Sequence, residues 1–153
     1  MPIEQYQGKS FWKVPSEYKP GKKLTEEMVR KVEEMLDVSL PKEYVSLMME
    51  QNGGELNYRY VFFEDDEAAI IPFFHELDEE TGVGLSQIFM TQLHLAERQV
   101  LLTGDMHTWT SLDYRYDHQP RVVYFYETGD GQWGEELIAE TFDLFLSKLF
   151  KKE

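Results

Sequence analysis

The chain of 153 residues contains no cysteine, which excludes disulfides, thiolate metal sites and cysteine nucleophiles. No run approaches the roughly 20 apolar residues of a membrane-spanning helix. The first residues also lack the basic start and apolar run of a signal peptide, so we expect a cytoplasmic protein. The length predicts one domain over residues 1–153, large enough to bury a core without cross-links.

Positive charge is also scarce, and it is unevenly spread. The chain has 15 Lys or Arg against 29 Asp or Glu, a net charge of −14. Residues 1–31 carry seven basic and four acidic side chains, whereas residues 32–153 carry eight and twenty-five. Such a surface repels phosphate backbones and anionic lipid, so we expect no direct binding to nucleic acid or membrane. A basic protein is the favoured partner.

The negative charge is concentrated in residues 44–97, which hold eleven acidic residues and a single basic one, Arg59. Charge runs are often only solvated faces, but the length of this one-signed stretch exceeds what solubility requires and favours a binding patch. Eight residues in two runs are therefore our candidate partner-binding residues: Glu64, Asp65, Asp66 and Glu67, then Glu76, Asp78, Glu79 and Glu80.

Apolar periodicity and capping residues predict the helices. One begins after Thr25, a second opens at Pro41 and ends at Asn52, and a third spans residues 85–93. A C-terminal helix begins after Thr141. Residues 1–23 are interpreted as a basic lead-in that Trp12 and Tyr18 pin to the domain.

Apolar and alternating runs predict the strands. Two of them, at residues 58–63 and 68–74, form a hairpin around the acidic turn, and four more lie at residues 99–103, 108–114, 121–127 and 136–139. In the first strand we expect Tyr58, Tyr60 and Phe62 to be core residues. The order predicts an α+β fold with two N-terminal helices, a largely antiparallel sheet of about six strands and a C-terminal helix.

One glycine pattern suggests a cofactor site. Gly129, Gly131 and Gly134 match the G-x-G-x-x-G of dinucleotide-binding loops. That motif requires a helix after the glycines, but here a strand follows and four carboxylates surround the loop. A hairpin turn is favoured, and we expect no cofactor.

The candidate catalytic groups are equally sparse. The four histidines are far apart in the sequence: His75, His94, His107 and His118. Only His94 has a carboxylate, Glu97, at helical spacing, and two ligands fall short of a catalytic metal site, so no metal is expected. Asp105, His107 and Ser111 resemble a triad fragment but lack the strained turn that would expose the serine. We expect no catalytic residue and no enzymatic activity.

An ordered set of short motifs resembles the SUKH superfamily, which includes the Smi/Knr cell-wall regulators of fungi and many bacterial immunity proteins. The set comprises Leu40-Pro41-Lys42-Glu43-Tyr44-Val45-Ser46-Leu47, Asn52-Gly53-Gly54, Leu101-Leu102-Thr103-Gly104-Asp105, His107-Thr108-Trp109, Leu112-Asp113-Tyr114-Arg115, Pro120 before Val122-Val123-Tyr124, Ile138-Ala139, Thr141-Phe142-Asp143 and Phe145-Leu146. One departure is Met106, where relatives often carry a glycine.

The resemblance implies a Smi/Knr-like α+β fold without a catalytic site. For bacterial members it implies an immunity protein that binds and blocks a toxin, often a nuclease. The motif residues, including Tyr44 and Trp109, are interpreted as structural, so charge is the guide to the binding surface. We therefore expect an antitoxin that binds a cognate, basic, nuclease-like toxin and is itself a monomer or weak homodimer. The alternative is a regulatory adaptor that binds signalling or cell-wall-assembly proteins.

Overall fold

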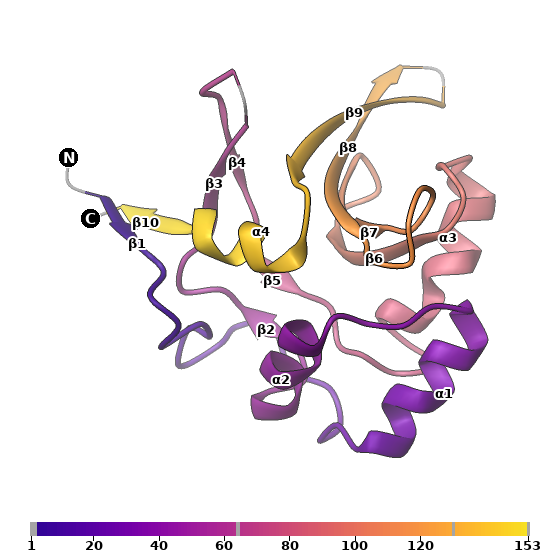
Figure 1. Ribbon diagram of the computed structural model, residues 1–153, viewed down its shortest axis with the longest axis horizontal. Helices are drawn as coiled ribbons and strands as arrows, with labels where there is room; N and C mark the ends of the chain where they lie inside the picture. Colours follow the sequence, from indigo (N-terminus) through magenta and orange to yellow (C-terminus); the bar gives the residue numbers. More distant parts are fainter. Residues whose placement is uncertain (1–2, 64, 130, 153) are drawn as a thin grey trace.

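The computed structural model describes residues 3–63, 65–129 and 131–152 (Figure 1). Its helices are α1 (Glu26–Leu36), α2 (Lys42–Glu50), the 3-10 helix η1 (Val83–Leu85), α3 (Ser86–Leu93) and α4 (Phe142–Lys148). Its strands are β1 (Ile3–Gln5), β2 (Gly54–Glu55), β3 (Tyr60–Phe62), β4 (Ala68–Ile70), β5 (Phe73–Phe74), β6 (Gln99–Gly104), β7 (Thr108–Asp113), β8 (Arg121–Gly129), β9 (Gln132–Ala139) and β10 (Phe150–Lys152).

The strands confirm the predicted α+β class with antiparallel pairing. One four-stranded sheet has the order β6-β7-β8-β9, and a second has the order β1-β10-β3-β4. A short pair, β2-β5, forms the remaining ladder. Figure 1 shows the β3–β4 and β8–β9 hairpins standing beside each other, with α1 and α2 on the opposite side of the molecule. The side chains of Phe63 and Tyr124 meet between these hairpins, with ring centroids 5.3 Å apart.

The predicted helix starts are confirmed by their caps. The hydroxyl of Thr25 accepts a hydrogen bond from the backbone of Met28 at 3.2 Å, and Thr141 accepts one from Leu144 at 3.2 Å. These bonds satisfy amide groups that have no partner inside the helix. Pro41 is the residue immediately before α2, one position earlier than the first-turn position its fixed φ angle suggested.

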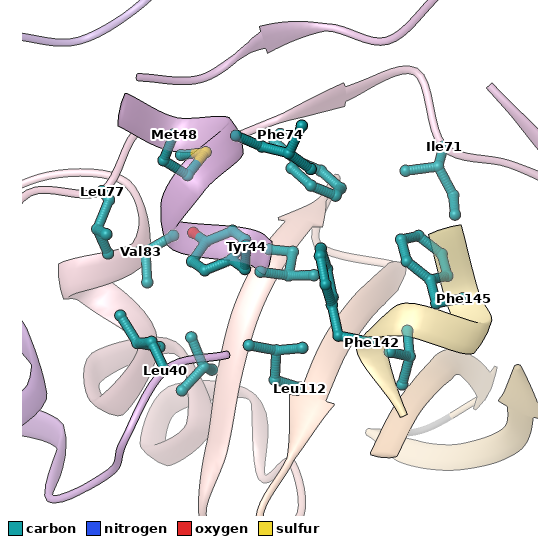
Figure 2. Packing of buried hydrophobic residues seen from close by; sticks show 14 of the residues in the cluster. Leu40, Tyr44, Met48, Ile71, Phe74, Leu77, Val83, Leu112, Phe142 and Phe145 are labelled. Carbon is teal, nitrogen blue, oxygen red and sulfur yellow. The ribbon is translucent and has the colours of Figure 1, made fainter. Parts of the chain in front are cut away.

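The main core lies where α2, α4 and the sheets meet. Tyr44 is fully buried there, and its ring packs edge-on against Phe142 at 5.7 Å and near Phe74 at 6.2 Å (Figure 2). Trp109 belongs to a second cluster, formed by β6, β7 and β8 beneath α3. Both aromatic residues are therefore core residues, as the sequence predicted.

Asn52 joins three segments beneath this core. Its side-chain amide donates to the carbonyl of Lys22 at 2.7 Å and to that of Leu77 at 3.0 Å, and it accepts from the amide of Leu77 at 2.8 Å. The side chain is 3% exposed. The Asn-Gly-Gly segment thus does more than end α2, because it fixes the lead-in and residues 75–82 against the helix.

The lead-in is more structured than expected. Trp12 and Tyr18 do pin it, since the indole of Trp12 donates to the carbonyl of Leu47 at 3.1 Å and the hydroxyl of Tyr18 donates to Glu76 at 2.6 Å. The segment also contributes β1, which pairs with β10, and neither strand was predicted. Three-residue strands paired across nearly the whole chain leave no local periodicity to detect.

The expected aromatic strand is only partly a core strand. Tyr58 is buried, but it precedes β3, while Phe62 is 44% exposed and stacks on Phe150 at 4.6 Å. Within β3 the core position belongs to Val61, because successive side chains of a strand point to opposite faces. The prediction of Phe62 as a core residue was wrong. The predicted strand 68–74 is likewise interrupted, and its second half, β5, pairs with β2.

Candidate partner-binding surface

The first acidic run forms the turn between β3 and β4. Asp65, Asp66 and Glu67 are all exposed, and Asp65 accepts a hydrogen bond from the backbone of Glu67 at 3.0 Å. Glu64 lies outside the described residues. Among the described residues, none of these three carboxylates has an ion-pair partner within 4.0 Å. The turn therefore presents unneutralised negative charge to solvent.

The second acidic run serves two purposes. Glu76 is half-buried and accepts the hydroxyl proton of Tyr18, while Asp78 is 8% exposed and accepts from the backbone of Glu80 at 2.9 Å. These two carboxylates shape the loop. Glu79 and Glu80 are exposed, and Glu79 lies 4.0 Å from the ammonium group of Lys31 on α1.

The fold does not bring the two runs together. The β3–β4 turn projects from one end of the molecule, while the loop that contains Glu79 lies against α1 at the other (Figure 1). A single partner footprint built on both runs would have to extend across the molecule. The free carboxylates of the first run and those of Glu79 and Glu80 are thus separate candidate surfaces.

A groove of about 430 Å³, which we call the inter-sheet groove, adjoins the first run. It lies between β4, the edge strand of its sheet, and strands β6, β7 and β8. Its lining includes Ile70, which is 56% exposed, and the half-buried Phe73 and Tyr124. An apolar groove bordered by carboxylates matches the anatomy of protein interfaces, which have an apolar centre and a polar rim.

A second, smaller cavity of about 210 Å³, the aromatic pocket, lies beside this groove. Both cavities are lined by Gly104 and Asp105 at the β6–β7 turn. The pocket walls are Tyr18, His75, Gly82, Leu85, Phe89, Leu101, Met106 and Trp109. The indole nitrogen of Trp109 is buried and has no hydrogen-bond partner among the described residues.

A short hydrogen-bond relay fixes one wall of the pocket. Tyr18 donates its only hydroxyl proton to Glu76 at 2.6 Å, so its oxygen accepts from Nδ1 of His75 at 3.1 Å. Nε2 of His75 then carries a lone pair. Burial lowers the pKa of His75, which keeps the ring neutral. Burial opposes ionisation of Glu76, but the hydrogen bonds it accepts, led by that from Tyr18, outweigh this and lower its pKa.

The β6–β7 turn is tightly constrained. One oxygen of Asp105 accepts from the backbone amides of His107 at 3.0 Å and Thr108 at 2.9 Å. Burial opposes its charge, but these bonds together lower its pKa, so the carboxylate is ionised at neutral pH. Gly104 has no room for a side chain, since a Cβ there would clash with the indole of Trp109.

Met106 is the strained residue of this turn, with a φ angle of 81°. A left-handed backbone costs a residue with a side chain roughly 1–2 kcal/mol, and glycine avoids that cost. The Met106 side chain is 45% exposed and lines the aromatic pocket.

The Leu-Asp-Tyr-Arg motif has a structural role. Asp113 is 1% exposed and accepts hydrogen bonds from Gln99, Arg115 and Arg121 at 2.7–3.1 Å. Burial alone would raise its pKa, but these bonds together lower it to about 2. Arg115 also binds Glu135 at 2.6 Å, which links β7 to β9. The ion pairs of this cluster stabilise the sheet.

The remaining candidate groups have structural partners. Gly134 lies within β9, where an added Cβ would meet the Tyr126 ring, and strand residues follow the glycines as predicted. Ser111 is buried and donates to Gln99 at 2.7 Å, while His107 binds Glu127 at 3.0 Å.

In the described part of the chain, no three His, Asp or Glu side chains lie close enough together to bind a metal ion. The helices of this part are also too short or too polar to span a membrane.

Comparison with known proteins agrees with the motif set. A family model, SUKH_6, described as SMI1-KNR4 cell-wall, matches residues 26–146. No curated protein and no solved structure matches the chain. The matched range begins at the first residue of α1, ends within α4 and holds every motif that resembled the superfamily. The chain therefore belongs to the SMI1-KNR4 family SUKH_6, within the SUKH superfamily that its motifs predicted.

Proposed function

We propose that this protein is a cytoplasmic immunity protein that neutralises a cognate toxin by binding it stoichiometrically. The proposed toxin is a basic protein, a nuclease in the first instance. Membership of the SUKH superfamily supports a protein partner, and a net charge of −14 supports a basic one. A nuclease attracts its polyanionic substrate with a basic cleft. The positive electrostatic field of that cleft also attracts an acidic protein, which can compete with the substrate.

The observation that carries this proposal is the pairing of an apolar groove with free carboxylates at its border. Ile70 is 56% exposed on the edge strand, and Asp65, Asp66 and Glu67 stand on the turn that leads into this strand. The apolar lining supplies area that favours burial, and the carboxylates supply attraction at long range. Both features are required for a partner that must be captured quickly and held.

We also propose that the protein acts without catalysis. The polar groups that could serve a reaction have other partners: Asp105 holds its turn, Ser111 is buried against Gln99, and Asp113 is enclosed by two arginines. This supports an antidote that blocks its target by occupying it. Turnover of a substrate by the purified protein, abolished by a single substitution, would contradict this view.

The test is stopped-flow association with the proposed basic toxin, using wild type and Asp65→Lys/Asp66→Lys. Steering by surface charge changes association rates by factors of ten or more at low salt. We expect roughly tenfold slower capture by the variant at low salt, a flatter salt dependence and an unchanged melting temperature, because exposed substitutions shift stability by about 0.5 kcal/mol or less.

The matched control is Glu79→Lys/Glu80→Lys, which changes the net charge by the same amount at the other candidate surface. A smaller effect in the control places the contact at the β3–β4 turn. A larger effect of Glu79→Lys/Glu80→Lys places the contact at the loop beside α1. Equal rates for all three proteins at every salt concentration would mean that both runs are solvated faces, and the steering part of the proposal would fail.

A further inference from the structure

The aromatic pocket has features that the fold does not require. Met106 keeps a side chain at a left-handed position that glycine would occupy without strain, and it places that side chain at the pocket. Met106 thereby adds an exposed apolar wall to the pocket. The pocket and the inter-sheet groove share Gly104 and Asp105, so the two cavities lie on either side of the β6–β7 turn.

The size of the pocket restricts its occupant. Cavities that bind small-molecule ligands typically measure roughly 300–1,000 Å³. The aromatic pocket measures about 210 Å³, which suits one long side chain of a bound protein. Its rings come from separate segments, with Tyr18 in the lead-in, Phe89 on α3 and Trp109 on β7.

The chemistry of the walls selects a cation with an apolar stem. The faces of tryptophan, tyrosine and phenylalanine attract guanidinium and ammonium groups. Asp105 adds a carboxylate whose Oδ2 has no hydrogen-bond partner among the described residues. Leu85, Leu101 and Met106 offer apolar contact for methylene groups. His75 adds no positive charge, and no Lys or Arg of the described residues lines the pocket.

We propose that the aromatic pocket captures an arginine side chain of the partner, with its guanidinium against the half-buried rings of Tyr18 and Phe89 and beside Asp105. Arginine fits better than lysine because its planar cation stacks on rings and is more weakly hydrated. The proposal rests on the proposed function for the source of the arginine, a basic toxin. The recognition itself is independent of that source.

The experiment uses a short peptide in place of the toxin. The tripeptide acetyl-Gly-Arg-Gly-amide is titrated into the ¹⁵N-labelled protein, and the citrulline analogue, which has the same shape without the charge, serves as the matched probe. We expect the arginine peptide to shift the Trp109 indole and the Gly104 and Met106 amides, with a Kd at least tenfold lower than that of the citrulline peptide. The lysine peptide should fall between them.

Two variants locate the site, and a third serves as the control. Asp105→Asn keeps an oxygen for the turn but removes the charge, and Phe89→Leu removes one ring; each should weaken arginine binding at least fivefold. Asp117→Asn removes the same charge from an exposed residue outside the pocket and outside both acidic runs, and it should stay within twofold of wild type. Met106→Gly should melt at the same or a higher temperature and bind the peptide severalfold more weakly.

Equal affinities for the arginine and citrulline peptides, or shifts confined to residues outside the pocket, would overturn the proposal. So would Asp105→Asn or Met106→Gly binding as tightly as wild type. The outcome is separable from the proposed function. If this protein inhibits the toxin but does not bind the arginine peptide, the pocket proposal fails and the proposed function stands. If it binds the peptide but does not inhibit the toxin, the pocket proposal stands and the proposed function fails.

Discussion

Replacement of Asp113 by asparagine should unfold this protein more readily than any exposed charge substitution. The carboxylate is 1% exposed and accepts from Arg115 at 2.8 Å and from Arg121 at 2.7 Å. Asparagine has nearly the same size, but it offers one acceptor oxygen in place of two and turns an amino group toward the guanidinium groups. Breaking a buried ion pair by removing one partner costs about 3–5 kcal/mol.

The pH dependence gives a second measure of the same interaction. The pKa of Asp113 falls from 3.8 to about 2 on folding, which corresponds to roughly 2 kcal/mol of stability. Because the folded-state pKa is the lower one, this contribution is complete above about pH 5 and is lost as the pH falls toward 2. The stability difference between wild type and Asp113→Asn should therefore shrink across that range.

Urea denaturation at a series of pH values measures both effects. The control is Glu135→Gln, because Glu135 binds the same Arg115 but its side chain is 43% exposed, and such pairs contribute at most about 1 kcal/mol. An Asp113→Asn loss below 1 kcal/mol, or one equal to that of Glu135→Gln, would refute the view that the buried cluster holds β7, β8 and β9 together. A stability difference that does not depend on pH would refute the assigned pKa.

Three further outcomes follow from the structure. Trp109→Ala should lose about 3–5 kcal/mol and melt at a much lower temperature, and a fully stable variant that fails only in partner binding would show that Trp109 is a contact residue. Asn52→Ala should lose about 1–3 kcal/mol in a urea melt, because the buried backbone groups of Leu77 lose their partner; an unchanged midpoint would contradict this. In an NMR titration, the hydrogen bond to Glu127 should raise the pKa of His107 above 6.5. The ion pair with Glu127 should therefore be lost as the pH rises through this raised pKa. Glu127→Gln should lower the pKa of His107, and an unchanged titration would exclude the pair.

The helices and the core could be predicted from the sequence because their signals are local. Thr25 and Thr141 cap helices whose apolar residues recur at helical spacing, and Tyr44 stands on such a face. The β6–β9 sheet is also marked by consecutive apolar or alternating runs. By contrast, β1 and β10 are three residues long and pair between the two ends of the chain, which no local pattern records.

The candidate surface was only partly accessible to the same reasoning. Sequence placed Glu76 and Asp78 with their exposed neighbours, but their hydrogen bonds to Tyr18 and Glu80 arise from the folded loop. The inter-sheet groove and the aromatic pocket combine residues from segments far apart in the chain. At Met106 the sequence departs from the glycine that the resemblance implies, but only the folded turn shows that this residue has a positive φ angle and lines the pocket.

The most direct test of the account is a titration of the toxin with its proposed antidote. The proposed basic toxin is held at a fixed concentration, its activity is measured as this protein is added, and the complex is sized by light scattering. The account predicts a linear loss of activity that reaches zero at one equivalent, with a one-to-one complex. Full toxin activity in the presence of several equivalents, with no complex formed, would contradict it.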